Sequence, residues 1–169
     1  MGKALLIAAA LALAGCGAAS GKAAEQSAPT VAHVGQPAPD WTEPTAPTGN
    51  LSFDSLHGHP VYLNFFATWC GPCNEEAPSI ESLQEKYGPQ GLRVVGIDVL
   101  EDAAKAESFK KEYHLSYPAV VDDGKLRDAY RINGLPVHAF IDRNGVIKNI
   151  VVGQMSADEI KTNVLSLLK

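Results

Sequence analysis

The feature that most constrains the fold is a short apolar run, Val61 to Phe66, that leads into the sequence Trp69-Cys70-Gly71-Pro72-Cys73. The run is short and follows a proline, so it predicts a strand buried on both faces. Pro72 suits the first turn of a helix, where its missing N–H has no partner to lose. The cysteines therefore stand at a strand-to-helix junction, where unpaired N–H groups and the helix dipole lower the pKa of a thiol. This placement predicts that Cys70 attacks disulfides and that Cys73, one turn further along, resolves the mixed disulfide.

Helix and strand patterns alternate after this motif. Apolar residues three and four apart predict helices, and short apolar runs predict strands. A tight turn at Asn144-Gly145, with positive φ at both residues, makes the last two strands antiparallel. A parallel βαβ half is therefore followed by a ββα half. The expected order after the first strand is a helix over 75–87, a strand over 92–99, a helix capped by Asp102, a strand over 117–121, a short helix over 125–131, strands over 137–142 and 146–152, and a helix opened by a Ser156–Glu159 capping box.

The first sixty residues are organised differently. Residues 1–15 combine Lys3 with an apolar stretch too short to span a bilayer, and they predict a signal peptide. The stretch ends in Leu13-Ala14-Gly15-Cys16, which resembles the bacterial lipoprotein box, whose cysteine is lipidated; an ordinary signal with a coincidental cysteine is the alternative. Residues 16–34 predict the lipidated cysteine and a flexible linker, because they are small and polar. The proline-rich stretch 35–60 predicts short strands with an edge hairpin.

Composition narrows the remaining choices. The 169 residues suit one domain, expected over 35–169. The formal net charge is -5 and no run of Lys or Arg occurs, which argues against nucleic-acid binding. Three cysteines are an odd number for an exported chain, and lipidation of Cys16 leaves a single redox pair.

These features together resemble a thioredoxin-fold protein, and more closely the membrane-anchored TlpA and ResA type of thiol:disulfide oxidoreductase. The resemblance covers about residues 35–169. It implies an α/β fold with a central mixed sheet flanked by helices and an N-terminal β-hairpin. The motifs that carry it are WCGPC at 69–73, Glu76 and Pro78 after it, GLP at 134–136 and FIDRNG at 140–145.

The resemblance also implies roles for residues around the cysteines. A cis peptide bond is expected before Pro136, and it would place the Leu135 backbone beside Cys70 as a platform for an extended substrate peptide. Trp69 is expected to cover the active site and contact substrate, or alternatively to pack as an ordinary aromatic. The Gly71-Pro72 pair influences the reduction potential, and it is the pairing found in reducing thioredoxins.

The proton partner of the cysteines departs from ordinary thioredoxins, which have a buried Asp where this chain has Asn64. An amide cannot relay a proton. Glu76, one turn beyond Cys73, is the replacement that the resemblance implies, and it should titrate with the two thiols as a coupled set. The alternative is a first-turn acid favoured only by the helix dipole. His138, two residues after Pro136, either tunes the thiolate or simply occupies its strand.

The resulting prediction is a thiol:disulfide oxidoreductase that is lipid-anchored on the periplasmic side of a bacterial membrane. We expect a monomer that needs no cofactor and no metal. By resemblance, a membrane dithiol donor supplies its electrons and protein disulfides are its substrates. Maturation of cytochrome c is one process that could use this activity, because apocytochromes carry CxxCH pairs that must be reduced before haem attachment.

Four other functions compete with this prediction. A structural disulfide gains little from a loop of two residues. A zinc site lacks a second CxxC or an HxxxH. A peroxiredoxin-like thiol peroxidase uses a different spacing from the one between Thr68 and Cys70. A metal or haem chaperone would hold its cargo through the two thiols, although Met1 and Met155 are the only methionines that could add to a copper site.

Overall fold

The computed structural model describes residues 31–169. The predicted signal peptide over 1–15, the predicted lipidation at Cys16 and most of the predicted linker lie outside this range. Within it, the elements are β1 (Thr42–Pro44), β2 (Asn50–Ser52), a 3₁₀ turn η1 (Phe53–Leu56), β3 (Val61–Phe66), α1 (Gly71–Tyr87), a 3₁₀ turn η2 (Gly88–Gln90), β4 (Arg93–Val99), α2 (Ala103–Glu112), β5 (Ala119–Asp122), α3 (Lys125–Ala129), β6 (Val137–Ile141), β7 (Ile147–Val152) and α4 (Ala157–Leu167).

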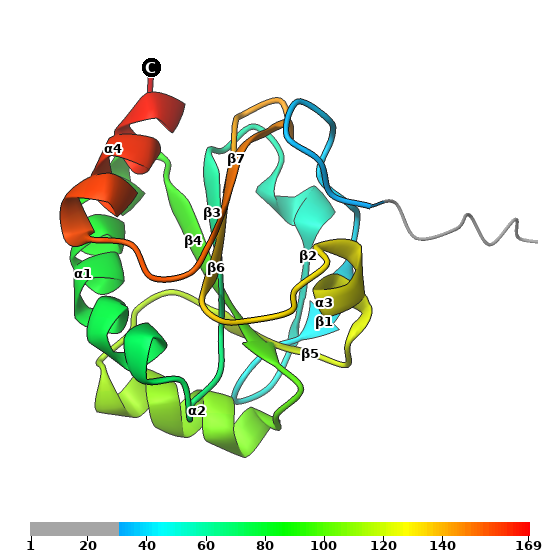
Figure 1. The fold of residues 1–169 in the computed structure, drawn as a ribbon, viewed down its shortest axis with the longest axis vertical. Coiled ribbons are helices and arrows are strands. Elements are labelled where there is room, and N and C mark those ends of the chain that lie inside the picture. Colours follow the sequence, from blue (N-terminus) through cyan, green and yellow to red (C-terminus); the bar gives the residue numbers. More distant parts are fainter. Residues whose placement is uncertain (1–30) are drawn as a thin grey trace, which may run out of the picture.

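A five-stranded mixed sheet forms the centre of the fold, with the strand order β5-β4-β3-β6-β7 (Figure 1). Strands β3, β4 and β5 are parallel, whereas β6 pairs antiparallel with both β3 and β7. This is the predicted thioredoxin arrangement. Because β3 is the middle strand, helix α1 begins at the centre of one end of the sheet, and the cysteines lie there.

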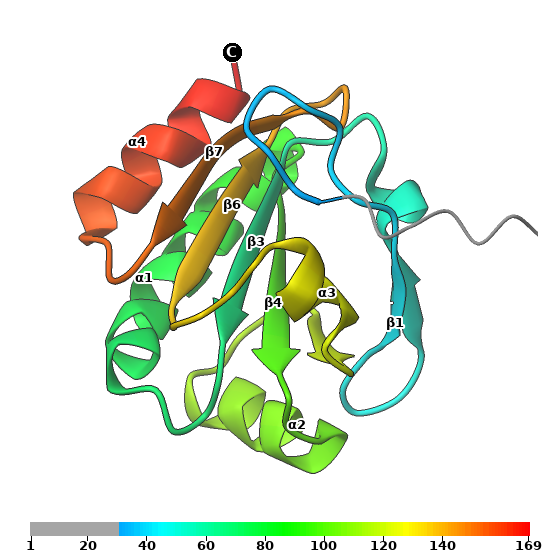
Figure 2. The ribbon, with the colours of Figure 1, turned by 45° about the vertical axis from the view of Figure 1, so that its right-hand side comes forward.

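Two hydrophobic clusters cover the two faces of the sheet. Tyr62 and Phe66 of β3 belong to the cluster packed against α1, α2 and α4, whereas Leu63 and Phe65 belong to the cluster under α3 and the N-terminal segment. Figure 2 shows α1 and α4 on one side of the sheet and α3 on the other. Strand side chains alternate between faces, so the buried Asn64 points to the α1 side with Tyr62 and Phe66.

The predicted N-terminal hairpin is present as β1 and β2, which pair antiparallel. It continues along β5, the outer strand of the main sheet. Thr45 forms an isolated bridge with Val120, and the N–H of Ala46 donates to the carbonyl of Ala119 at 2.9 Å. The hairpin therefore covers a sheet edge whose unpaired backbone groups could otherwise recruit another chain.

The turn between β6 and β7 differs from the prediction. Only Gly145 has a positive φ, of 76°, and Asn144 does not. The reason is Asp142, whose Oδ1 accepts the N–H groups of Asn144 and Val146 at 2.9 and 3.0 Å, while its carbonyl accepts the N–H of Gly145. The carboxylate thus closes a longer turn with a single left-handed glycine, instead of a two-residue turn.

Both predicted helix caps are confirmed. Asp102 accepts the N–H of Lys105 at the start of α2, and Ser156 forms a reciprocal capping box with Glu159 at the start of α4. These caps satisfy N–H groups that have no partner inside the helix. No helix within residues 31–169 has both the length and the apolar character needed to cross a membrane.

Candidate active site

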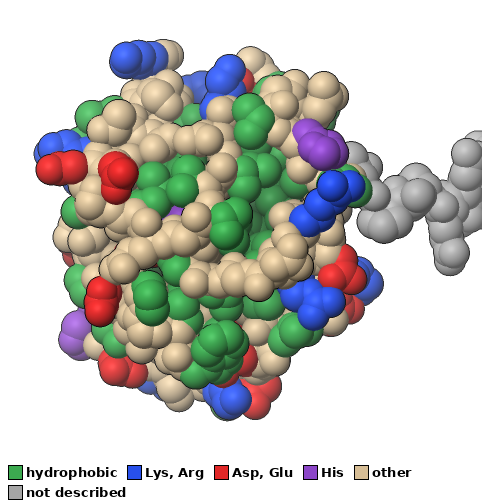
Figure 3. All heavy atoms as spheres, viewed as in Figure 1, with side chains coloured by type: hydrophobic (Ala, Val, Ile, Leu, Met, Phe, Trp, Pro, Cys, Tyr) green, Lys and Arg blue, Asp and Glu red, His purple; other side chains and the backbone are tan. Residues whose placement is uncertain are grey.

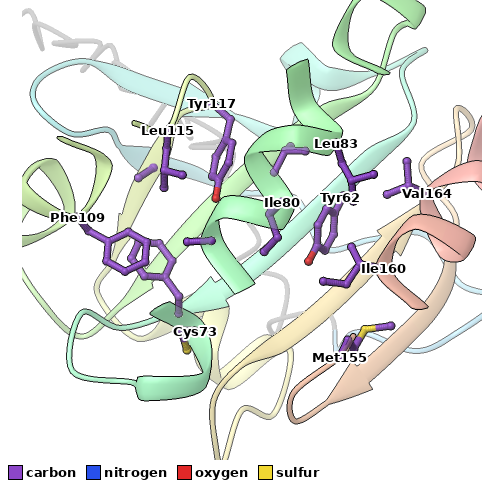
Figure 4. Packing of buried hydrophobic residues seen from close by; sticks show 14 of the residues in the cluster. Tyr62, Cys73, Ile80, Leu83, Phe109, Leu115, Tyr117, Met155, Ile160 and Val164 are labelled. Carbon is purple, nitrogen blue, oxygen red and sulfur yellow. The ribbon is translucent and has the colours of Figure 1, made fainter. Parts of the chain in front are cut away.

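The two cysteines form a disulfide at the N-terminus of α1, with a Cα–Cα distance of 5.3 Å. Cys70 is the N-cap of the helix, and its Sγ accepts the N–H of Cys73 at 3.3 Å. Cys70 is 5% exposed and Cys73 is 2% exposed. Figure 4 shows Cys73 in the first turn of α1, at one end of the hydrophobic cluster that also contains Tyr62 and Ile80. When the disulfide is reduced, this backbone N–H and the helix terminus favour a thiolate at Cys70.

The surface around the disulfide carries exposed apolar side chains. Trp69 is 73% exposed, so it is not a core aromatic, and Leu100, at the same end of the sheet, is also exposed. Figure 3 shows hydrophobic side chains over the middle of this face and at the end of the molecule where β3 and β4 finish in Figure 1. Gly71 and Pro72 are exposed in the first turn of the helix. An incoming protein can therefore contact this face without displacing the core.

The segment before β6 lies against the same cluster. The Leu135–Pro136 peptide bond is cis, as expected from the resemblance. Leu135 is half-buried and packs against the cluster that contains both cysteines, and Pro136 is buried. The carbonyl of Pro136 accepts the N–H of Gly153, whereas the backbone of Leu135 makes no hydrogen bond to any described residue. That backbone is therefore free to pair with an added strand.

Glu76 lies one turn beyond Cys73, on the same side of α1, because residues three apart are neighbours on a helix. Its carboxyl group is buried, and Oε1 accepts the N–H of Met155, in the segment before α4, at 2.6 Å. Burial raises the pKa of Glu76 to about 7; the Met155 hydrogen bond opposes this rise and the Glu75 carboxylate adds to it. Glu76 can thus exchange a proton at neutral pH, unlike a solvated acid at a helix start.

His138 approaches Glu76 from β6. It is opposite Asn64 of β3 in the sheet register, and its side chain is fully buried. Its Nε2 lies 3.6 Å from Glu76 Oε2 and 3.2 Å from the carbonyl of Gly153, while Nδ1 lies 2.8 Å from the hydroxyl of Tyr62. His138 therefore lies near polar groups of Glu76, Gly153 and Tyr62 in addition to occupying its strand.

Sequence reasoning missed a second buried carboxyl group near the motif. Asp98 of β4 is opposite Phe66 of β3, it is fully buried, and neither of its oxygens has a donor partner in the described part of the chain. Burial, followed by the Glu101 carboxylate, raises the pKa of Asp98 to about 8. When protonated, Asp98 can donate a hydrogen bond to the Glu101 carboxylate. Glu101 also accepts the N–H and the hydroxyl of Thr68, at 2.6 and 2.9 Å, two residues before Cys70. The signal was an aspartate inside an apolar strand.

One acidic group could in principle hold a metal ion. The side-chain oxygens of Glu43, Asp122 and Asp123 lie within 4.8 Å of one another, and this is the only such group found among residues 31–169. It contains neither cysteine. Asp122 already accepts the N–H groups of Gly124, Leu126 and Arg127 at the start of α3. Asp122 of this group therefore stabilises the start of α3.

Comparisons with known proteins agree with this geometry. The model of the AhpC/TSA family matches residues 34–150. The thiol-disulfide oxidoreductase ResA of Geobacillus thermodenitrificans is 32% identical over 139 residues, which are 82% of this chain and 80% of that protein. The chain belongs to the AhpC/TSA family and is a ResA-type thiol:disulfide oxidoreductase.

Solved structures extend the likeness to the fold of this ResA-type oxidoreductase. A thiol:disulfide interchange protein of the thioredoxin family from Chlorobium tepidum is 30% identical, with a TM-score of 0.73, and the match covers 84% of this chain and 98% of that one. A secreted disulfide oxidoreductase of Mycobacterium tuberculosis, homologous to DsbE of E. coli, is 29% identical with a TM-score of 0.70, over 75% of this chain and 96% of that one.

Proposed function

We propose that this ResA-type oxidoreductase reduces protein disulfides, with Cys70 as the attacking thiol, Cys73 as the resolving thiol and Glu76 as the proton partner. The observation that carries the proposal is the disulfide at the N-terminus of α1 with the buried Glu76 one turn beyond it. An ionised carboxylate beside two thiols disfavours their thiolate forms. A less stable dithiolate lowers the reduction potential, and this supports a reductant over an oxidant.

The reaction proceeds by two thiol–disulfide exchanges. The Cys70 thiolate attacks a substrate disulfide, a mixed disulfide forms, and the first substrate sulfur leaves as a thiolate that takes a proton. Cys73 then gives its proton to Glu76 and attacks the Sγ of Cys70. The Cys70–Cys73 disulfide forms, and the second substrate sulfur leaves and takes the proton back from Glu76. The substrate gains two electrons from the enzyme's two sulfurs. It also gains two protons, one from Cys73 by way of Glu76 and one from the solvent.

Substrate recognition fits the face around the disulfide. An extended peptide can pair with the free backbone of Leu135, beside the cis Pro136, while its disulfide meets Cys70. The exposed ring of Trp69 offers an apolar contact to the same peptide. Recognition of this kind is mostly through the main chain, so we infer a broad range of protein disulfide substrates.

The proposal places the protein outside the cytoplasm, attached to a bacterial membrane through lipidated Cys16. The support is the lipoprotein-box sequence at 13–16 and the likeness to a secreted disulfide oxidoreductase. In this setting a membrane dithiol donor would reduce the active-site disulfide again, and apocytochrome c is one substrate whose cysteines need reduction. Anchoring is tested by labelling cells with a radioactive fatty acid, with and without Cys16→Ala.

The direction of the reaction is tested by the reduction potential of the Cys70–Cys73 couple. The chain lacking residues 1–30 is equilibrated against dithiothreitol and glutathione buffers, and the oxidised fraction is read after thiol trapping. We expect a potential of about -250 mV or lower, in the range of thioredoxin. A potential near about -120 mV is that of a disulfide-forming oxidant and would reverse the proposed direction.

Glu76→Gln should slow disulfide exchange about 10-fold or more at pH 7, because the amide cannot accept the proton of Cys73. The pH dependence that comes from the pKa of about 7 should also disappear. The measurement is the single-turnover rate with a peptide disulfide between pH 6 and pH 9. Glu75→Gln is the matched control, since Glu75 is the exposed neighbour and bonds to Gln154 instead. Equal rates for Glu76→Gln and the wild type at every pH would remove Glu76 from the mechanism.

A further inference from the structure

Glu76 has one oxygen that its hydrogen bond to Met155 does not use. Oε2 is buried and has no partner at hydrogen-bond distance in the described part of the chain. Nε2 of His138, on β6, lies 3.6 Å from this oxygen. A buried carboxyl oxygen without a donor is costly, so the group beside it decides how easily Glu76 ionises.

The hydrogen bonds of His138 determine which ring nitrogen carries the proton. The carbonyl of Gly153, 3.2 Å from Nε2, can only accept, so Nε2 must be the protonated nitrogen. Nδ1 is then an acceptor. Nδ1 accepts a hydrogen bond from the hydroxyl of Tyr62 at 2.8 Å, and the amide nitrogen of Asn64 lies 3.5 Å from it. In this tautomer the protonated Nε2 lies 3.2 Å from the carbonyl of Gly153 and 3.6 Å from Oε2 of Glu76.

Tyr62 supports this arrangement from the middle of the sheet. Its ring stacks on Phe140 at a centroid distance of 4.7 Å and on His138 at 6.0 Å. Figure 4 shows Tyr62 between α1 and α4, with its hydroxyl directed toward the end of the cluster where Met155 lies. The stacked rings leave the hydroxyl and the imidazole little freedom to turn, so the tautomer is held by packing as well as by hydrogen bonds.

We propose that His138 is a positioning residue for Glu76, donating its Nε2–H to the free carboxyl oxygen in the tautomer that the Gly153 carbonyl fixes and the Tyr62 hydroxyl supports. This inference deepens the proposed function and rests on Glu76 as the proton partner. With Met155 holding one oxygen and His138 the other, the carboxylate keeps a single orientation one turn beyond Cys73. Asn64 takes part as a contact of the imidazole, at the position where ordinary thioredoxins place their proton-relaying acid.

Among the described groups around Glu76, His138 is the one that can donate a hydrogen bond to Oε2. Burial lowers the pKa of His138 to about 4, against the Gly153 hydrogen bond, which raises it, so the ring is neutral while Glu76 titrates. The groups that face Glu76 are Cys73 and Glu75 on α1, Tyr62 on β3, His138 on β6 and the Met155 backbone before α4. Within residues 31–169, His138 is the only side chain among them that offers an N–H to Oε2.

The test compares two amides at position 138. The amide nitrogen of glutamine reaches the place of imidazole Nε2, whereas asparagine reaches only the place of Nδ1. The full chain is prepared in its disulfide form with ¹³C-labelled glutamate, and the ionisation of Glu76 is followed by NMR from pH 4 to pH 10, with Glu76→Gln used to assign the signal. We expect His138→Asn to raise the midpoint by half a pH unit or more and His138→Gln to keep it within about 0.3 unit of the wild type.

Tyr62→Phe is an independent test, because it removes the hydrogen bond to Nδ1 that supports the tautomer and leaves the Gly153 contact in place. We expect an upward shift smaller than that of His138→Asn. The pH at which the disulfide-exchange rate changes should shift together with the midpoint of Glu76 ionisation in each variant. An unchanged midpoint in His138→Asn overturns the inference, and so does an equal shift in both amide variants. The NMR titration does not depend on activity, so it tests the inference separately from the proposed function. The proposed function fails if the wild-type protein does not reduce protein disulfides.

Discussion

Cys70→Ser abolishes disulfide reduction, with an expected loss of at least about 1,000-fold in the rate of insulin reduction. A serine hydroxyl is not ionised at neutral pH, even at a helix N-terminus, so no nucleophile remains at the N-cap of α1. Cys73 is a poor replacement, because it lies inside the first turn of α1 and is the less exposed of the two, at 2% against 5% for Cys70. The helix itself should persist, since serine is a favoured N-cap residue.

Cys73→Ser is the matched variant, and it should behave differently. Cys70 still attacks, but nothing resolves the product, so a mixed disulfide with substrate accumulates and is detected by mass spectrometry under non-reducing conditions. Two results would contradict the assignment: a Cys70→Ser protein that still reduces insulin, or a Cys73→Ser protein that turns over hydrogen peroxide. The second result would support the thiol peroxidase.

Asp98→Asn should make the protein more stable at pH 8 and remove a large part of its pH dependence. The pKa of Asp98 is raised to about 8 in the folded state, against about 3.9 in an unfolded chain. The folded state therefore holds a proton that the unfolded state releases, and stability falls as the pH rises from about 4 to about 8. Between pH 5 and pH 8 the wild type should lose about 2–4 kcal/mol more than the variant, at about 1.4 kcal/mol per pKa unit.

The raised pKa of Asp98 comes first from its burial and then from the contact with Glu101. Burial opposes ionisation of Glu101, but hydrogen bonds from Thr68, Lys105 and Asp98 outweigh it and lower its pKa. Asp98 must then be the partner that carries the proton, and an asparagine amide can donate at the same place without titrating. Urea unfolding at several pH values measures the difference. Asp102→Asn is the control, because this exposed residue caps α2 and asparagine caps equally well.

A parallel pH dependence in the wild type and in Asp98→Asn would show that Asp98 does not hold a proton in the folded state. The same experiment bears on function, because Glu101 holds the N–H and hydroxyl of Thr68 in the loop that leads to Cys70. Loss of the Asp98 proton places two carboxylates together behind this loop. The activity of the wild type above pH 8 should therefore fall more than that of Asp98→Asn.

Local features of the chain were predictable because their physical cause lies within a few residues. The apolar run 61–66 is β3, the cysteine pair opens α1, and the caps at Asp102 and Ser156 begin their helices. Each depends on hydrogen bonds or apolar spacing inside one turn or one strand. The predicted type of the turn after β6 was wrong for an equally local reason. The Asp142 side chain accepts the N–H groups of Asn144 and Val146 and so stabilises a different turn from the one that Asn144-Gly145 predicts.

By itself the sequence determined the fold class, the redox pair and the presence of an acid one turn beyond it. Only the tertiary structure decided what surrounds that acid. His138 and Glu76 are 62 positions apart, and they meet because the pairing of β6 with β3 turns His138 toward the face that α1 covers. Alternation along a strand says that every second side chain lies on the same face, but sheet register and helix packing decide which distant groups meet there.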